Sequence, residues 1–180
     1  MLESIDQWIT HLTGLAGPGT CPDPTELPPT TLPPGSPDTV LWRAATAPDD
    51  AAALELADRL LAARPGQSLV DAGTFLALEV WTESELGALH ALARVVRRAP
   101  TPARAHRLDE LRRWHLEHTQ PDNATNRPWA IHVFLRSPDP ESWLYAETLL
   151  HNVHASDARG EGLSRWILRD TLRELRAAAP

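Results

Sequence analysis

The sequence contains no lysine: all 17 of its basic side chains are arginines. A phosphate-binding loop of the form G-x-x-x-x-G-K-S/T is therefore excluded, and neither G-x-G-x-x-G nor G-x-S-x-G occurs. The 24 acidic residues give a net charge of −7, which argues against general nucleic-acid binding. The lack of lysine, together with abundant Ala, Leu, Pro and Arg, is typical of a bacterial genome of high GC content.

Cysteine and long apolar runs are also scarce. The single cysteine, Cys21, excludes an intramolecular disulfide and a Cys-rich zinc site. It lies in a proline-rich stretch with no histidine beside it, so we do not expect it to act as a nucleophile. No apolar run approaches the ~20 residues that span a bilayer. The acidic start, MLESIDQW, lacks the pattern of a signal peptide, which indicates a cytoplasmic protein.

The first segment, residues 1–17, is predicted to be an amphipathic helix. A helix of this length is not stable alone in water, so it must dock on its own domain, on a second copy or on a partner. Its predicted docking face consists of the side chains that recur at helical spacing: Leu2, Ile5, Trp8, Ile9 and Leu12.

Residues 18–39 are predicted to be a proline-rich linker, with eight prolines between positions 18 and 37. Proline removes main-chain donors and fixes φ, which excludes helix and central strand. At ~3.1 Å per residue, an extended segment of about 20 residues reaches up to ~60 Å. The linker is either a loop on the surface of the main domain or a tether that carries the first helix to another molecule. A ligand for an SH3-like domain is a third possibility, although no basic residue flanks the prolines.

The remainder, residues 40–180, is predicted to be a compact all-α domain of six or seven helices, arranged as a bundle or a short helical repeat. Ser68 and Asp71 resemble a capping box and predict a helix over residues 69–80. The alternative is an α+β fold, because the apolar runs 74–81 and 129–135 could also form short strands.

The last predicted helix begins after Gly160 or Gly162 and ends near Ala177. Its apolar residues follow one stripe, and we place its arginines on the solvent-facing side with Asp170 and Glu174 between them.

The helix predicted over residues 140–155 carries a polar stripe. Glu147, His151 and His154 recur at i, i+4 and i+7 beside its apolar face. On the helix predicted over residues 102–118, two further histidines fall within the apolar face. If the two helices face each other, five potential metal ligands converge: His115, His118, Glu147, His151 and His154.

Imidazole and carboxylate ligands suit zinc, iron or manganese. However, the spacing is Glu-x-x-x-His where helical diiron proteins use Glu-x-x-His, and H-E-x-x-H is absent. The competing interpretation is that these histidines stabilise helix ends, where a cation is favoured.

Tryptophan is unusually frequent, with seven against two phenylalanines and one tyrosine. These side chains either fill seams between helices or line a ligand groove. We therefore predict a non-catalytic helical interaction or scaffold module without a cofactor, whose partner is a protein or a second copy, and not a nucleic acid or a membrane. The alternatives are a zinc-, iron- or manganese-binding protein and a helical-repeat domain with a tryptophan-lined groove. The sequence does not specify a ligand, the partner's identity or the oligomeric state.

Overall fold

The computed structural model describes residues 2, 4–29, 36–74, 77–119, 125–155 and 161–178. These residues form eight α-helices and one short 3-10 helix, and they contain no strand. The helices are α1 (Ile5–Ala16), α2 (Pro37–Thr46), α3 (Ala51–Ala63), η1 (Ala72–Thr74), α4 (Leu78–Arg98), α5 (Pro102–His118), α6 (Ile131–Leu135), α7 (Pro140–Ala155) and α8 (Gly162–Ala178).

The predicted all-α fold is confirmed. The alternative strands are wrong, because residues 78–81 form the first turn of α4 and residues 131–135 form α6; residues 75 and 76 lie outside the described part. Among the described helices, none is both long and apolar enough to cross a membrane.

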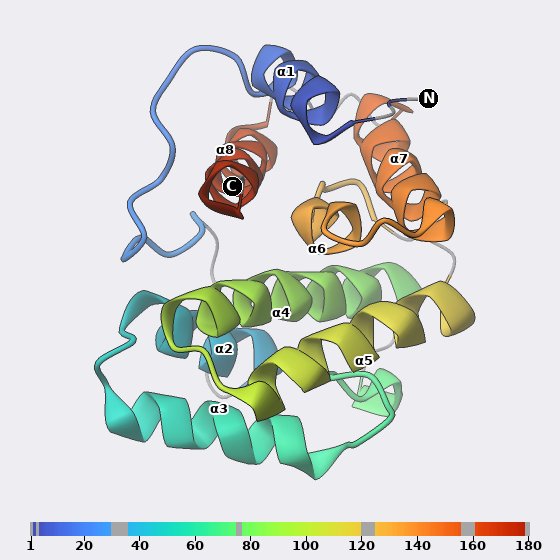
Figure 1. Cartoon of the computed structure of the whole chain (residues 1–180). Helices are drawn as coiled ribbons and strands as arrows, with labels where there is room; N and C mark the ends of the chain where they lie inside the picture. Colours follow the sequence, from blue (N-terminus) through green and yellow to red (C-terminus); the bar gives the residue numbers. More distant parts are fainter. Residues whose placement is uncertain are drawn as a thin grey trace.

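The helices form two layers (Figure 1). One contains α2, α3, α4 and α5, and the other contains α1, α6, α7 and α8. Helix α4 packs against α2, α5 and α6, and every residue from Glu85 to Val95 is buried. A helix buried on all sides must satisfy its polar side chains internally, so Glu85, His90 and Arg94 each need partners within the protein.

Helix α2 begins at Pro37, within the stretch predicted as linker over residues 18–39. Proline is favoured at the first position of a helix, where its missing N–H costs nothing. Leu41 and Trp42 follow and are buried, so docking on the core stabilises the helix. The linker therefore ends earlier than its proline content indicates.

The helix predicted over residues 69–80 is wrong for most of its length. Glu85 accepts hydrogen bonds from the main-chain N–H groups of Leu69, at 2.9 Å, and Val70, at 2.6 Å. Trp81 Nε1 donates to the carbonyl oxygen of Val70 at 3.0 Å. Because side chains of α4 bind these main-chain groups, the segment is held as an irregular connection against α4.

Aromatic side chains fill the seam between the two layers. The ring of Trp42 lies 6.0 Å from that of Trp129, 5.7 Å from that of Trp166 and 5.6 Å from that of His90. The guanidinium group of Arg94 lies 5.0 Å from the Trp42 ring, within range of a cation–π interaction. These tryptophans therefore pack core elements that are distant in sequence.

The role of Glu85 leads to a stability prediction. We expect Glu85→Gln to lower the free energy of unfolding by about 1–3 kcal/mol, because the two N–H groups bind different carboxylate oxygens and the amide replaces one of these acceptors with an NH2 donor. The measurement is urea denaturation followed by circular dichroism. The matched control is Glu79→Gln on the exposed face of α4, which we expect to be nearly neutral. Equal unfolding midpoints for the two variants would contradict this role.

Candidate functional site

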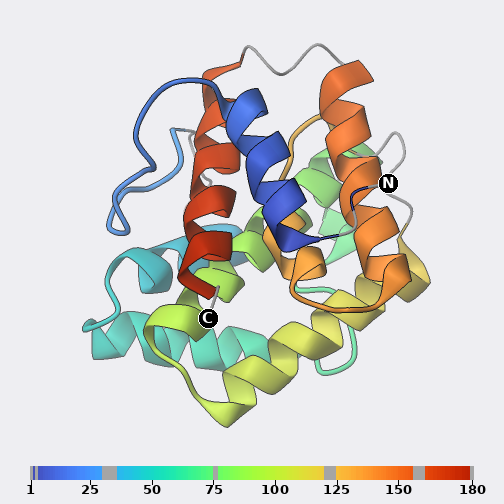
Figure 2. The same cartoon turned by 45° about the horizontal axis from the view of Figure 1, so that its top comes forward.

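The N-terminal helix packs on α8, with α7 on its other side (Figures 1 and 2), and we call the surface that it covers the groove. Trp8, Leu12 and Ala16 are each at most 1% exposed, and they occupy one face at a spacing of four residues. Ser4 caps the helix by accepting a hydrogen bond from the N–H of Gln7 at 3.2 Å. The helix is therefore docked on its own chain through an apolar stripe.

Polar contacts lie at both edges of this groove. On the α7 side, Glu147 accepts a hydrogen bond from the main-chain N–H of Leu2 at 3.3 Å. On the α8 side, Arg176 donates to the hydroxyl oxygen of Thr13 at 3.1 Å. Of the predicted docking residues, Trp8 and Leu12 are fully buried, whereas the other three pack against the core and are partly exposed: Leu2, Ile5 and Ile9.

A strap, residues 17–29, continues from α1 across the surface toward α2 (Figure 1). Arginines of α4 and α8 donate hydrogen bonds to main-chain carbonyl groups along this stretch. The acceptors are the carbonyl oxygens of Ala16 and Pro18 for Arg169, of Pro22 for Arg173, of Pro24 for Arg98, and of Pro24 and Glu26 for Arg94. Residues 18–29 of the predicted linker are thus a surface loop of its own chain.

The composition of the strap explains these contacts. Its prolines lack N–H groups, so its main chain offers more carbonyl acceptors than N–H donors. The arginine side chains supply the donors for these carbonyl groups. Hydrogen bonds from charged donors each contribute about 1.5–3 kcal/mol. A turn from Asp23 to Glu26, closed by a 2.9 Å main-chain hydrogen bond, interrupts the extended path. Gly19 has a φ of 138°, and an added Cβ would lie 2.6 Å from Cζ of Arg169, so a larger residue would strain the backbone and displace this guanidinium group.

Behind the strap, two fully buried carboxylates of α8 hold the arginines in place. Asp170 contacts Arg173 and lies 3.6 Å from Arg94. Glu174 is shared by three arginines, at 2.7 Å from Arg97, 3.1 Å from Arg173 and 3.6 Å from Arg136. Both acids are therefore in the core, and their predicted place on the solvent-facing side of the last helix is wrong.

The hydrogen bonds of His90 define its tautomer. Its Nδ1 accepts the main-chain N–H of Ala130 at 3.1 Å, so the ring proton is on Nε2, which donates to Asp170 at 2.9 Å. Ala130 adopts the left-handed region, with φ of 57°, and this conformation directs its N–H at the imidazole. Burial alone would raise the pKa of Asp170, but the His90 hydrogen bond and the charges of Arg94 and Arg173 outweigh it and lower the pKa.

His132 of α6 is fully buried, and its ring centroid lies 4.4 Å from that of His90. Neither ring nitrogen has a hydrogen-bond partner among the described residues. Burial first, and then the neighbouring His90 ring and the charges of nearby arginines, lower the pKa of His132 well below 6.5. The imidazole is therefore neutral in the folded protein at neutral pH.

The structure does not bring the five predicted metal ligands together. His118 is exposed and stacks on Trp114 with ring centroids 5.0 Å apart, and His151 is exposed on α7. Glu147 and His154 face α1, where the ring of His154 lies 6.3 Å from that of His11. Among the described residues, no group of three or more His, Cys, Asp or Glu side chains is arranged to hold a metal ion.

His115 is the one predicted ligand in the core. Its Nε2 lies 3.5 Å from Oε1 of Glu85, and its Nδ1 lies 3.2 Å from the hydroxyl of Thr119. The same hydroxyl is 2.6 Å from that of Tyr145, so this chain of polar groups links α4, α5 and α7. The helical wheel places His115 on the inner face of its helix, but it does not reveal Glu85 as its neighbour.

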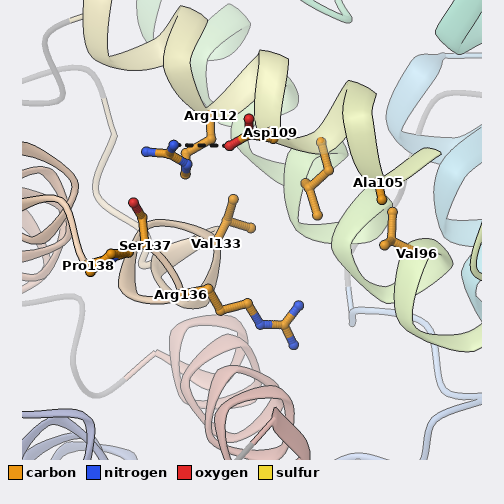
Figure 3. A pocket seen from close by; sticks show the side chains of 9 residues that line it. Val96, Ala105, Asp109, Arg112, Val133, Arg136, Ser137 and Pro138 are labelled. Carbon is orange, nitrogen blue, oxygen red and sulfur yellow. Dashed lines mark hydrogen bonds and ion pairs between the residues drawn. The ribbon is translucent and has the colours of Figure 1, made fainter. Parts of the chain in front are cut away.

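A pocket of about 320 Å³ opens between α4, α5 and the end of α6 (Figure 3). Its apolar lining comprises Val96, Ala105, Leu108, Val133 and Pro138. The polar groups on its rim are Ser137, Asp109, Arg112 and Arg136. No tryptophan lines this pocket, in contrast to the predicted tryptophan-lined groove.

Comparison with known proteins identifies no relative of this chain. No family model matches the chain, and neither the curated proteins nor the solved structures contain a match. The fold and the groove define an all-α protein whose amphipathic N-terminal helix is docked on its own chain.

The neutral, buried His132 predicts acid sensitivity. In the unfolded chain a histidine takes up a proton as the pH falls through about 6.5, whereas the folded protein resists this protonation. Its contribution is fully present above pH 6.5 and is lost below it, by up to about 1.4 kcal/mol per pH unit. We expect His132→Leu to flatten the decline of the free energy of unfolding between about pH 6.5 and 5.

The measurement is urea denaturation across this pH range. The exposed residue His151 provides the control, because His151→Leu leaves the buried imidazole in place and should keep the wild-type slope. A wild-type slope in the His132→Leu variant would contradict the assignment.

Proposed function

We propose that this protein is a non-catalytic helical interaction module in which the groove between α7 and α8 binds an amphipathic helix. In the resting state the occupant is α1 of the same chain. In the assembled state the occupant is α1 of a second copy, so that two chains exchange their N-terminal arms, each consisting of α1 and the strap. The observation that carries this proposal is the complete burial of Trp8 and Leu12 in the groove.

The contact has the features of helix-in-groove recognition. An apolar face with anchors one turn apart enters a groove, while polar residues of the same helix remain outside. Full burial of a large apolar side chain stabilises by about 1.5–3 kcal/mol, so Trp8 and Leu12 are the anchors of α1. Since α1 is too short to persist alone, its helical state depends on this docking.

Chain connectivity supports a second copy as the exchange partner. Every copy carries both the helix and its matching groove, so an exchanged arm makes the same contacts that it makes within one chain. A 180-residue domain has a radius of gyration of about 16 Å. When the strap docks together with α1, residues 30–36 alone make the crossing between copies, and seven residues extend to about 22 Å, which is enough to join two molecules in contact.

The test uses a labelled peptide of residues 2–17 and two full-length proteins, wild type and Leu12→Asp. The buried aspartate displaces the chain's own α1, because an unpaired charge is costly in an apolar groove. We expect the peptide to bind the variant at least about tenfold more tightly than the wild type, in which the tethered α1 competes at high effective concentration. Fluorescence anisotropy measures both affinities.

A peptide with the same Leu12→Asp change is the matched control and should bind neither protein. Circular dichroism and thermal unfolding establish that the variant's main domain remains folded. A folded variant that fails to bind the wild-type peptide would show that the groove is not a helix-binding site. For the exchange, we expect copies carrying different tags to form mixed dimers, and copies without α1 to form none.

A further inference from the structure

The pocket between α4, α5 and the end of α6 has the size and lining of a small-molecule site. Its volume of about 320 Å³ lies at the lower end of the range of about 300–1,000 Å³ for ligand pockets. Val133 forms the middle of the lining, with Val96 and Ala105 on one side and Pro138 on the other (Figure 3). An apolar group of a ligand would therefore be surrounded by apolar side chains.

The two arginines of the rim differ in their electrostatic surroundings. Arg112 donates to Asp109 at 3.0 Å and to the hydroxyl oxygen of Ser142 at 2.6 Å, and it lies 3.8 Å from Asp139. Arg113 also pairs with Asp109, at 3.0 Å, so two arginines face two carboxylates here. Arg112 is consequently a poor site for a further anion.

Arg136 is not balanced in this way. Its nearest carboxylate, Glu174, already contacts Arg97 and Arg173, and Asp170 is shared by Arg173 and Arg94. Four guanidinium groups thus face two carboxylates, and the nearby His132 is neutral. This part of an acidic protein therefore carries excess positive charge.

Two further observations indicate that a negative group would be stabilised here. Nη2 of Arg97 is buried and has no acceptor among the described residues. Burial lowers the pKa of Arg136, and the charge of Arg97 lowers it further, although Glu174 opposes both effects. An additional negative group beside Arg136 would relieve this repulsion.

We propose that this pocket binds a small monocarboxylic acid with an apolar body, whose carboxylate pairs with Arg136 while its apolar body lies over Val96, Leu108 and Val133. The planar guanidinium group matches a carboxylate with two parallel hydrogen bonds. A dianionic phosphate is disfavoured, because Arg136 and Arg97 lie at the C-terminal ends of α6 and α4, where the carbonyl groups are partially negative. This site is separate from the helix groove and does not depend on arm exchange.

The test compares three probes of equal chain length on the full-length protein: octanoate, octan-1-ol and octyl phosphate. Titration calorimetry measures affinity, and NMR shifts of the pocket methyl groups locate the binding. We expect octanoate to bind at least about tenfold more tightly than either other probe, because a hydrogen bond to a charged group contributes about 1.5–3 kcal/mol.

Two variants separate the charge from the cavity. Arg136→Met should lower octanoate affinity about tenfold, to the level of octan-1-ol, while Glu174 keeps its other two arginines. Ala105→Trp, at an exposed position of the lining, should abolish binding of all probes by filling the pocket. Arg59→Met on α3 is the charge-matched control and should bind octanoate like the wild type, since Arg59 pairs with Glu55 away from the pocket.

Several outcomes would overturn the proposal. Equal affinities for octanoate and octan-1-ol would exclude recognition by charge, and tighter binding of octyl phosphate would replace the carboxylate with a phosphate ester. Unchanged octanoate binding by folded Arg136→Met and Ala105→Trp would place any binding outside this pocket. No detectable binding of octanoate to the wild type would exclude the site.

Discussion

The rest of the structure depends on the ion pairs that Asp170 and Glu174 make inside the protein. Burying a carboxylate costs several kcal/mol unless it is paired and hydrogen-bonded, and breaking a buried pair costs about 3–5 kcal/mol. These two acids lie one turn apart on α8, and their partners come from α4, α6 and α8 itself. The same arginines reach the carbonyl groups of the strap. One pair of carboxylates therefore couples the two layers of the fold to the N-terminal arm.

Local periodicity predicted most helices, because it records which face of a segment is buried. The bounds of α5 and α7 agree with the predicted segments 102–118 and 140–155. The prediction for residues 69–80 was wrong because the backbone there bonds to Glu85, more than a turn of chain away. A capping-box pattern describes only local partners, so it cannot register competition from a distant carboxylate.

Only the part of the candidate site that is formed by apolar side chains at helical spacing was predictable from the sequence. Trp8 and Leu12 follow from the pattern of α1, since helical spacing alone identifies the buried face. Asp170 and Glu174 did not follow, because charged residues on a helix usually face water. Their burial requires Arg94 and Arg97, about 75 residues earlier in the chain, and no spacing rule connects such partners. Pairing at long range, rather than any local motif, determines this part of the structure.

In the proposed exchange, the helix and the strap contribute different physical terms. Apolar burial of α1 is non-directional and supplies affinity, but it tolerates small shifts along the groove. The hydrogen bonds from Arg98 and Arg173 to carbonyl groups are directional, so they set the position of the chain that follows. These hydrogen bonds are made to main-chain carbonyl oxygens and do not depend on particular side chains. Because proline has no N–H, few main-chain donors compete with the arginines for these oxygens. Both parts of the arm thus contribute affinity, but only the directional hydrogen bonds of the strap fix the register, so a substitution that removes one of them should alter the position of the chain as well as its affinity.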